Sequence, residues 1–319
     1  MELMFDAPHV EVLDPRYDAG PGFLVDADAA VVTTVERPDW QPITPPPAKP
    51  ESLAFVDGIQ RTEAWLRTTS REHPAPIAGG AVAIGVGCVV ADVGARIALG
   101  EITVERSVVF AGPDALHLPT TDGITWHSLW AVEGHPDPID AAVSLRRTNL
   151  EQHLAERLTA AGRLVVIDGG LKRVRAIAGP VMGAVKSHQR RYVDDDHAAV
   201  ITALAIGQRT PLFSIGTDRF SWYQRLPVAH PHGWAGILRG ELPREFSVAE
   251  AVRLANRATR ELPRYAGREH RDPRAPQNLT PVAALEKDLR RRLGDPRLAL
   301  RAIRRAAGRA QLNAMEATA

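Results

Sequence analysis

The sequence has few of the features that mark secreted, thiolate-bound or membrane-spanning proteins. Of its 319 residues one is cysteine, Cys88, so the chain cannot form an internal disulfide or a zinc site built from several thiolates. Residues 1–6 contain neither the basic nor the apolar segment of a signal peptide. The longest apolar run, 77–91, is rich in glycine and too short to span a bilayer. We therefore expect a cytoplasmic protein without a membrane segment.

Two further absences concern nucleotide binding and charge. The chain has no Gly-x-x-x-x-Gly-Lys-Ser/Thr loop, so we do not expect it to hydrolyse ATP by that route. The formal net charge is only +1, but acidic residues dominate positions 1–57 and basic residues dominate positions 286–309. A basic end of this kind can follow a phosphate backbone or can simply be a solvated helix face, and composition alone does not decide between them.

A proline-rich stretch at residues 40–50 divides the chain. Such a stretch is stiff and extended, so we predict an N-terminal extension and linker over residues 1–50 and one domain over residues 51–319. Hydrophobic residues make up 45% of the sequence and charged residues 24%, which is ordinary for a globular domain.

The order of predicted elements indicates the fold class. A buried strand at 52–56 ends at Asp57-Gly58 and resumes through 64–66, and strands at 77–91 and 102–110 follow without helical spacers, which favours an antiparallel meander. A helix over 138–161, N-capped by Asp137, leads to a strand at 163–169 that we expect to be parallel to the first. A further strand is predicted at 181–186, and helices at 248–262, 281–292 and 298–309. This order predicts an α/β ribonuclease-H-like fold, a mixed sheet flanked by helices; a doubly wound sheet is the alternative.

Two of these strands end in the same dipeptide, Asp57-Gly58 and Asp168-Gly169. If the strands are parallel neighbours, their backbones lie about 4.8 Å apart and the two carboxylates repel unless a cation lies between them. Oxygen ligands alone favour Mg²⁺ or Mn²⁺ over zinc. The alternative is that each Asp-Gly simply forms a turn.

The predicted helix before Asp168 carries two acids, Glu151 and Glu156. At 100° per residue Glu156 lies nearly opposite the apolar stripe and should face water, whereas Glu151 flanks the stripe and can lean over the edge of the sheet. Glu151 is therefore the better candidate ligand, and an ion pair with Arg147 one turn earlier is its alternative role.

Several short motifs, taken in order, resemble the NurA nuclease family and its bacterial branch over residues 51–300. They are Phe55-Val56-Asp57-Gly58, Glu151, Val165-Val166-Ile167-Asp168-Gly169-Gly170-Leu171, Gly183-Ala184-Val185-Lys186, Gly207-Gln208-Arg209-Thr210-Pro211-Leu212-Phe213, Ser221-Trp222-Tyr223, residues 272–279 and residues 285–295. The sequence departs from the family where Ile59 and Gly170 follow the two Asp-Gly pairs, and where Asp272-Pro273-Arg274 stands in place of a late histidine.

The resemblance implies a homodimeric, Mn²⁺-dependent DNA nuclease that processes DNA ends with the hexameric ATPase HerA. It assigns metal-ligand and catalytic roles to Asp57, Glu151 and Asp168, and a catalytic role to Lys186. The last ligand falls on Asp272, with His270 as the competitor. On this assignment Asp57 bridges two metal ions, which activate water and neutralise charge in phosphodiester hydrolysis. The rival is a non-catalytic adaptor that keeps the fold and binds the ATPase or DNA.

The segment 186–192 mixes cations with an aromatic ring. Lys186, Arg190 and Arg191 together with Tyr192 suit single-stranded DNA, because such sites combine charge with base stacking. The alternative is a solvated loop. We predict these three cations as DNA-binding residues.

Overall fold

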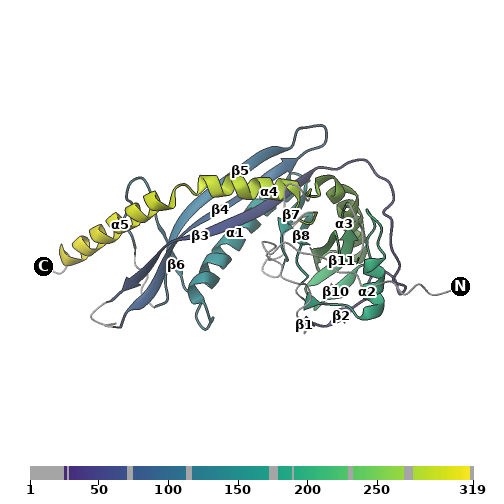
Figure 1. Ribbon diagram of the computed structural model, residues 1–319, viewed down its shortest axis with the longest axis horizontal. Coiled ribbons are helices and arrows are strands. Elements are labelled where there is room, and N and C mark those ends of the chain that lie inside the picture. The colour runs from purple at the N-terminus through teal and green to yellow at the C-terminus, as the bar shows by residue number, and fades with distance from the viewer. Residues whose placement is uncertain are drawn as a thin grey trace.

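The computed structural model describes residues 25–26, 29–69, 75–112, 117–171, 179–188, 190–228, 233–268 and 276–316. It is a mixed α/β structure in which a large sheet is flanked by helices, consistent with the ribonuclease-H-like fold that the sequence predicts (Figure 1). The strands are β1 (Val25–Asp26), β2 (Val31–Val32), β3 (Leu53–Thr68), β4 (Ile77–Ala91), β5 (Ala98–Phe110), β6 (His127–Trp130), β7 (Leu164–Asp168), β8 (Val181–Val185), β9 (Arg190–Arg191), β10 (Phe213–Ile215), β11 (Arg219–Arg225) and β12 (Ile237–Pro243). The helices are α1 (Pro138–Ala160), α2 (Asp195–Thr202), α3 (Val248–Glu261), the short 3-10 helix η1 (Leu262–Tyr265), α4 (Thr280–Arg292) and α5 (Pro296–Glu316).

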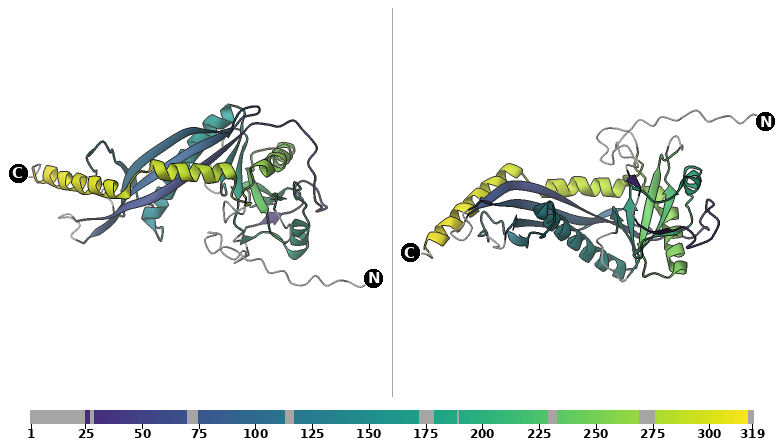
Figure 2. Two further views of the ribbon diagram at one scale, coloured as in Figure 1. Left: turned by 45° about the horizontal axis from the view of Figure 1, so that its top comes forward. Right: turned by 90° about the horizontal axis from the view of Figure 1, so that it is seen from below.

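The large sheet has the order β2-β10-β11-β12-β8-β7-β3-β4-β5-β6. Strands β3, β4 and β5 form the predicted antiparallel meander. After α1 the chain returns through β7, which pairs in parallel with both β3 and β8, as expected for a strand that follows a crossover helix. Figures 1 and 2 show β3, β4 and β5 extending together as a long arm, with α5 packed along it.

The predicted end of the first strand is wrong. Strand β3 does not stop at Asp57-Gly58 but continues to Thr68, because β4 pairs with it along almost its whole length, through a register shift between Thr62 and Ala64. The strand that ends near Asp57 is β7, which pairs with the edge of β3 opposite to β4. Its last paired residues with β3 are Val56 and Ile167, so the same register brings Asp57 and Asp168 level.

Alternation along β3 gives the sheet two apolar faces. Ala54 and Val56 pack with α1 on one face, whereas Leu53 and Phe55 pack with α3 and α4 on the other. All four are fully buried, and burying a side chain as large as Phe55 contributes about 1.5–3 kcal/mol. The sheet is therefore a fixed layer between helices, which holds its polar residues in defined places.

Helix α1 begins as the sequence predicts. Pro138 is its first residue, and the Asp137 carboxylate caps it by accepting a hydrogen bond of 3.0 Å from the Asp140 amide. This cap fixes where the helix starts and hence which of its residues reach the end of β7.

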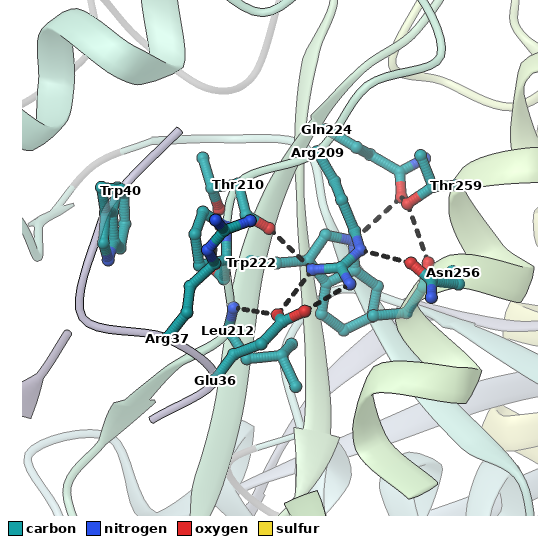
Figure 3. A network of polar contacts seen from close by, with 12 residues as sticks. Glu36, Arg37, Trp40, Arg209, Thr210, Leu212, Trp222, Gln224, Asn256 and Thr259 are labelled. Carbon is teal, nitrogen blue, oxygen red and sulfur yellow. Dashed lines mark hydrogen bonds and ion pairs between the residues drawn. The ribbon is translucent and has the colours of Figure 1, made fainter. Parts of the chain in front are cut away.

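The segment before the predicted domain boundary also contacts the sheet. Strand β2 pairs with β10, and Ile43 forms a bridge with Arg209. Figure 3 shows Glu36 bound by Arg209, whose Nη1 and Nη2 each lie 2.8 Å from a Glu36 carboxylate oxygen. Arg209 is completely buried and also donates from Nε to Asn256, so this pair ties residues 29–50 to the sheet. The boundary at residue 50 stays a prediction.

Candidate metal centre

Three carboxylates converge where β7 ends. One oxygen from each of Asp57 on β3, Asp168 on β7 and Glu286 on α4 lies within 4.8 Å of the other two. Asp57 is 8% exposed and Glu286 8% exposed, so the group is largely shielded from water. The two strand acids thus meet as the sequence predicts, and the third acid is one that the sequence analysis did not select.

The backbone turns sharply directly after Asp168. Gly169 follows with φ of +98°, a conformation that side chains rarely adopt, so the chain turns away immediately after the acid. Strand β3 continues past this point without β7 beside it, so Asp57 lies level with the carboxyl end of the shorter strand. Ligand sites commonly form at such strand ends.

Glu286 reaches the cluster because α4 lies close to the sheet. Leu285 and Leu289 pack into the core on this face, and two glycines of β4 give them room. A Cβ on Gly87 would lie 3.1 Å from Leu285 Cδ1, and one on Gly85 would lie 3.2 Å from Cδ2 of Leu293, directly after the helix, and in ordinary contact with Leu289. An acid in this buried stripe is the signal that could have identified Glu286 from sequence.

Glu151 approaches the cluster from α1, on the other face of the sheet. It passes over Gly58, where a Cβ would lie 2.5 Å from Glu151 Oε1 and 2.9 Å from Val86 Cγ2, so the glycine makes room for the carboxylate in this position. Its Oε1 also lies 3.8 Å from Arg147 Nε. Glu151 thus forms the predicted ion pair with Arg147. It is not one of the three described acids whose oxygens lie within 4.8 Å of one another, so its role as a metal ligand stays a prediction.

Lys186 brings a positive charge to the acids, directly after β8. Its Nζ lies 2.6 Å from Asp168 Oδ2 and donates a hydrogen bond of 2.8 Å to Asn278 Oδ1. Asn278 is completely buried, so the lysine is held in one position. Of the residues predicted from sequence, Asp57, Asp168 and Lys186 are thus neighbours in space.

The electrostatics of the site show an excess of negative charge. Burial raises the pKa of Asp57 well above its usual value, and the charges of Asp168, Glu151 and Glu286 raise it further, against the opposing effect of Lys186. Burial likewise raises the pKa of Glu151 to about 7; Arg147 opposes this rise and Asp168 adds to it. The protein therefore binds protons at this site where free carboxyl groups would not.

The donor set fits a hard divalent cation. Asp57, Asp168 and Glu286 offer only oxygen, the ligand that Mg²⁺ and Mn²⁺ prefer, and their crowding is the arrangement that a cation would relieve. Among the described residues this is the one group of three or more potential metal ligands close enough to share an ion.

The remaining predicted site residues are not in this cluster. Arg190 and Arg191 form β9, where Arg191 pairs with Asp195 at 3.0 Å and Arg190 lines a separate cavity. Asp272 and His270, the two candidates for the last ligand, lie outside the described residues.

Comparisons with known proteins do not identify the chain. No protein-family model matches it, and no curated protein matches its sequence. Within the part of the chain that the structure describes, no helix is long and apolar enough to cross a membrane.

Proposed function

We propose that this protein is a divalent-metal-dependent DNA nuclease of the NurA type, which acts as a homodimer on DNA ends with a HerA-like hexameric ATPase. The observation that carries the proposal is the convergence of Asp57, Asp168 and Glu286 within 4.8 Å, next to Lys186. Acids from two strands and one helix, joined by a lysine, provide what phosphodiester cleavage needs: cation ligands and a positive charge for the phosphate.

Each residue has a distinct task in this proposal. Asp57, Asp168 and Glu286 hold the metal, and Glu151 completes the ligand set from the opposite face. When bound, Mn²⁺ or Mg²⁺ neutralises phosphate charge and lowers the pKa of water. Without a metal Glu151 has a pKa of about 7, and a bound cation would favour its ionised form, so metal binding and proton release are coupled at this residue. Lys186, fixed by Asn278, offers Nζ to a phosphate oxygen.

A second candidate function, a non-catalytic adaptor that binds the ATPase or DNA, is favoured by one observation. Lys186 already lies 2.6 Å from Asp168, so the protein itself neutralises one of the acids without a cation. An adaptor with this pair would not need a metal for folding or for binding its partners.

Digestion assays separate the two candidates. Plasmid and single-stranded DNA are incubated with the full chain in Mn²⁺, Mg²⁺ or EDTA, and the same is done with Asp57→Asn, Asp168→Asn and Glu286→Gln. Asp288→Asn is the matched control, because Asp288 lies on the same helix as Glu286 but pairs with Arg292 at 2.6 Å.

The proposal predicts metal-dependent cleavage that the three cluster variants lose and the control keeps. Cleavage that survives in Asp57→Asn would show that the acid cluster is not the nuclease site. No cleavage under any condition would support the adaptor. Light scattering on the same samples tests the proposed homodimer.

A further inference from the structure

A second polar site lies beside the acid cluster, in a cavity of about 240 Å³. Its floor contains Arg219 on β11 with Arg239 and Glu241 on β12, and each of the two arginines is only 7% exposed. Buried arginines in a cavity are costly unless they are paired, so their partners decide what the cavity can hold.

The arginines outnumber the acid that faces them. One oxygen of Glu241, Oε1, lies 3.1 Å from Arg219 Nη1 and 2.9 Å from Arg239 Nη1. The other oxygen, Oε2, accepts a hydrogen bond of 2.8 Å from the Leu171 amide. Arg219 has a second partner in the exposed Asp218, 3.2 Å from its Nε.

Arg239 is the less satisfied of the two guanidinium groups. Its contact with Glu241 lacks hydrogen-bond alignment, and its buried Nη1 makes no hydrogen bond to any described residue. The guanidinium lies over the ring of Tyr192, 4.5 Å from the centroid, which holds it in place. A buried donor without an aligned acceptor is suited to an anion that enters the cavity.

The rest of the wall adds donors and positive charge. Ser187 and Tyr192 contribute hydroxyl groups, and the exposed Arg190 stands at the rim. No cavity-lining residue other than Glu241 carries a negative charge within the described part of the chain. The cavity therefore favours a compact anion with several oxygens.

The cavity and the acid cluster are neighbours across the end of the sheet. Gly170, which lines the cavity, is two residues after Asp168, so their Cα atoms are at most about 7 Å apart. Ser187 is likewise adjacent in sequence to Lys186. The strand pairing puts Asp168, Ala184 and Gly240 in one row, so Arg239 points to the opposite face from Asp168. A nucleic-acid strand that crosses the carboxyl end of β7 would meet the acids on one face of the sheet and the arginines on the other.

We propose that this cavity, here called the arginine cavity, binds a phosphate group of the nucleic-acid strand that is cut at the acid cluster. This inference rests on the proposed nuclease function and adds the residues that set the position of the strand. Arginine suits the role because its planar fork matches phosphate oxygens, and the fixed guanidinium of Arg239 needs no reorganisation to accept them. The phosphate is either a terminal monoester or an internal diester next to the bond that is cut.

The test measures binding, not cleavage, so that its result is independent of the metal site. Anisotropy of an internally labelled single-stranded DNA is recorded in EDTA for the wild type and Arg239→Gln. Glu241 keeps Arg219 and the Leu171 amide as partners in this variant, and urea unfolding checks that it is folded. Arg190→Gln is the second variant. Because Arg190 is exposed at the rim of the cavity, this variant does not need the urea-unfolding control.

Arg253→Gln is the matched control. It removes the same charge from α3, which packs on the opposite face of the sheet from Arg239, and Arg253 is exposed. Asp57→Asn, assayed for metal-dependent cleavage, reports separately on the metal site.

We expect Arg239→Gln to weaken binding about tenfold or more and to lower the slope of log affinity against log salt by about 0.7, whereas Arg253→Gln changes neither as much. DNA carrying a 5′-phosphate, a 3′-phosphate or hydroxyl ends shows whether the bound phosphate is terminal or internal. If the wild type prefers one terminal phosphate and Arg239→Gln loses that preference, the bound phosphate is terminal. If Arg239→Gln loses affinity equally for all three DNAs, the bound phosphate is internal. Affinity losses in Arg239→Gln and Arg190→Gln no greater than in Arg253→Gln would overturn the inference. If Asp57→Asn keeps metal-dependent cleavage while Arg239→Gln loses binding, the proposed metal centre is wrong and the arginine cavity stands.

Discussion

The replacement Glu151→Gln should stabilise the metal-free protein at high pH. Glu151 has a pKa of about 7 in the folded chain, against an ordinary value of 4.5. Because the folded value is the higher one, folding favours the protonated acid, and the stability that this gives is lost as the pH rises from 4.5 through 7. Glutamine carries no charge at either pH, so the Glu151→Gln variant does not lose this stability as the pH rises.

The size of the effect follows from the same two values. A rise from 4.5 to about 7 corresponds to about 3 kcal/mol in the free energy of unfolding, at about 1.4 kcal/mol per pKa unit. The free energy of unfolding of Glu151→Gln should exceed that of the wild type by nearly all of this amount at pH 8. At pH 5, where the folded acid is still protonated, the difference should be less than about 1 kcal/mol. Asp57 does not cancel from the difference, because the charge of Glu151 contributes to the raised pKa of Asp57, and removing that charge stabilises the folded protein further at high pH.

Urea unfolding in EDTA at pH 5 and pH 8 measures this difference. Glu156→Gln is the control, since Glu156 is exposed on the same helix, five residues further on. We expect Glu151→Gln to be more stable than the wild type at pH 8 and similar to it at pH 5, with the control close to the wild type at both. Equal stability of the two variants at pH 8 would refute the view that Glu151 is buried among other acids.

Three other substitutions test separate parts of the account. Gly58→Ala would place a Cβ 2.5 Å from Glu151 Oε1, so we expect a loss of about 1–3 kcal/mol in urea unfolding and weaker Mn²⁺ binding by calorimetry; unchanged values for both would contradict the close approach. Arg209→Met leaves the carboxylate of Glu36 without its bidentate partner and should cost about 3 kcal/mol, and a loss below about 1 kcal/mol would mean that this pair does not hold the N-terminal segment in place. Lys186→Gln removes a positive charge that competes for Asp168, so it should raise Mn²⁺ affinity but lower the cleavage rate by about 100-fold, and a wild-type rate would remove the lysine from the proposed chemistry.

The pairing of Asp57 with Asp168 could be predicted from the sequence because it depends on local patterns and one topological rule. Both acids follow apolar runs of strand character, and the helix between them implies a parallel return. The end of the first strand could not be read from Gly58, since the turn preference of Asp-Gly is weaker than the pairing with β4 that continues to Thr68.

The arginine cavity, and the placement of Glu286 beside the two strand acids, could not be predicted because each depends on long-range packing. In the sequence Glu286 is one charged residue of a basic helix. Only the packing of α4 against the glycines of β4 brings it to the two strand acids. Arg239 and Glu241 alternate along β12 and therefore share a face, but only the pairing of β12 with β8 brings them next to the end of β7.

The central claim is that Asp57, Asp168 and Glu286 form one binding place for a divalent cation. Anomalous diffraction from crystals of the protein soaked in Mn²⁺ tests it most directly. The account predicts an anomalous peak within coordinating distance of oxygens from all three side chains, and its loss in Asp57→Asn. The claim would be contradicted if the three carboxylates were well ordered with no anomalous peak between them. It would also be contradicted by an Mn²⁺ peak at another place that persists in Asp57→Asn.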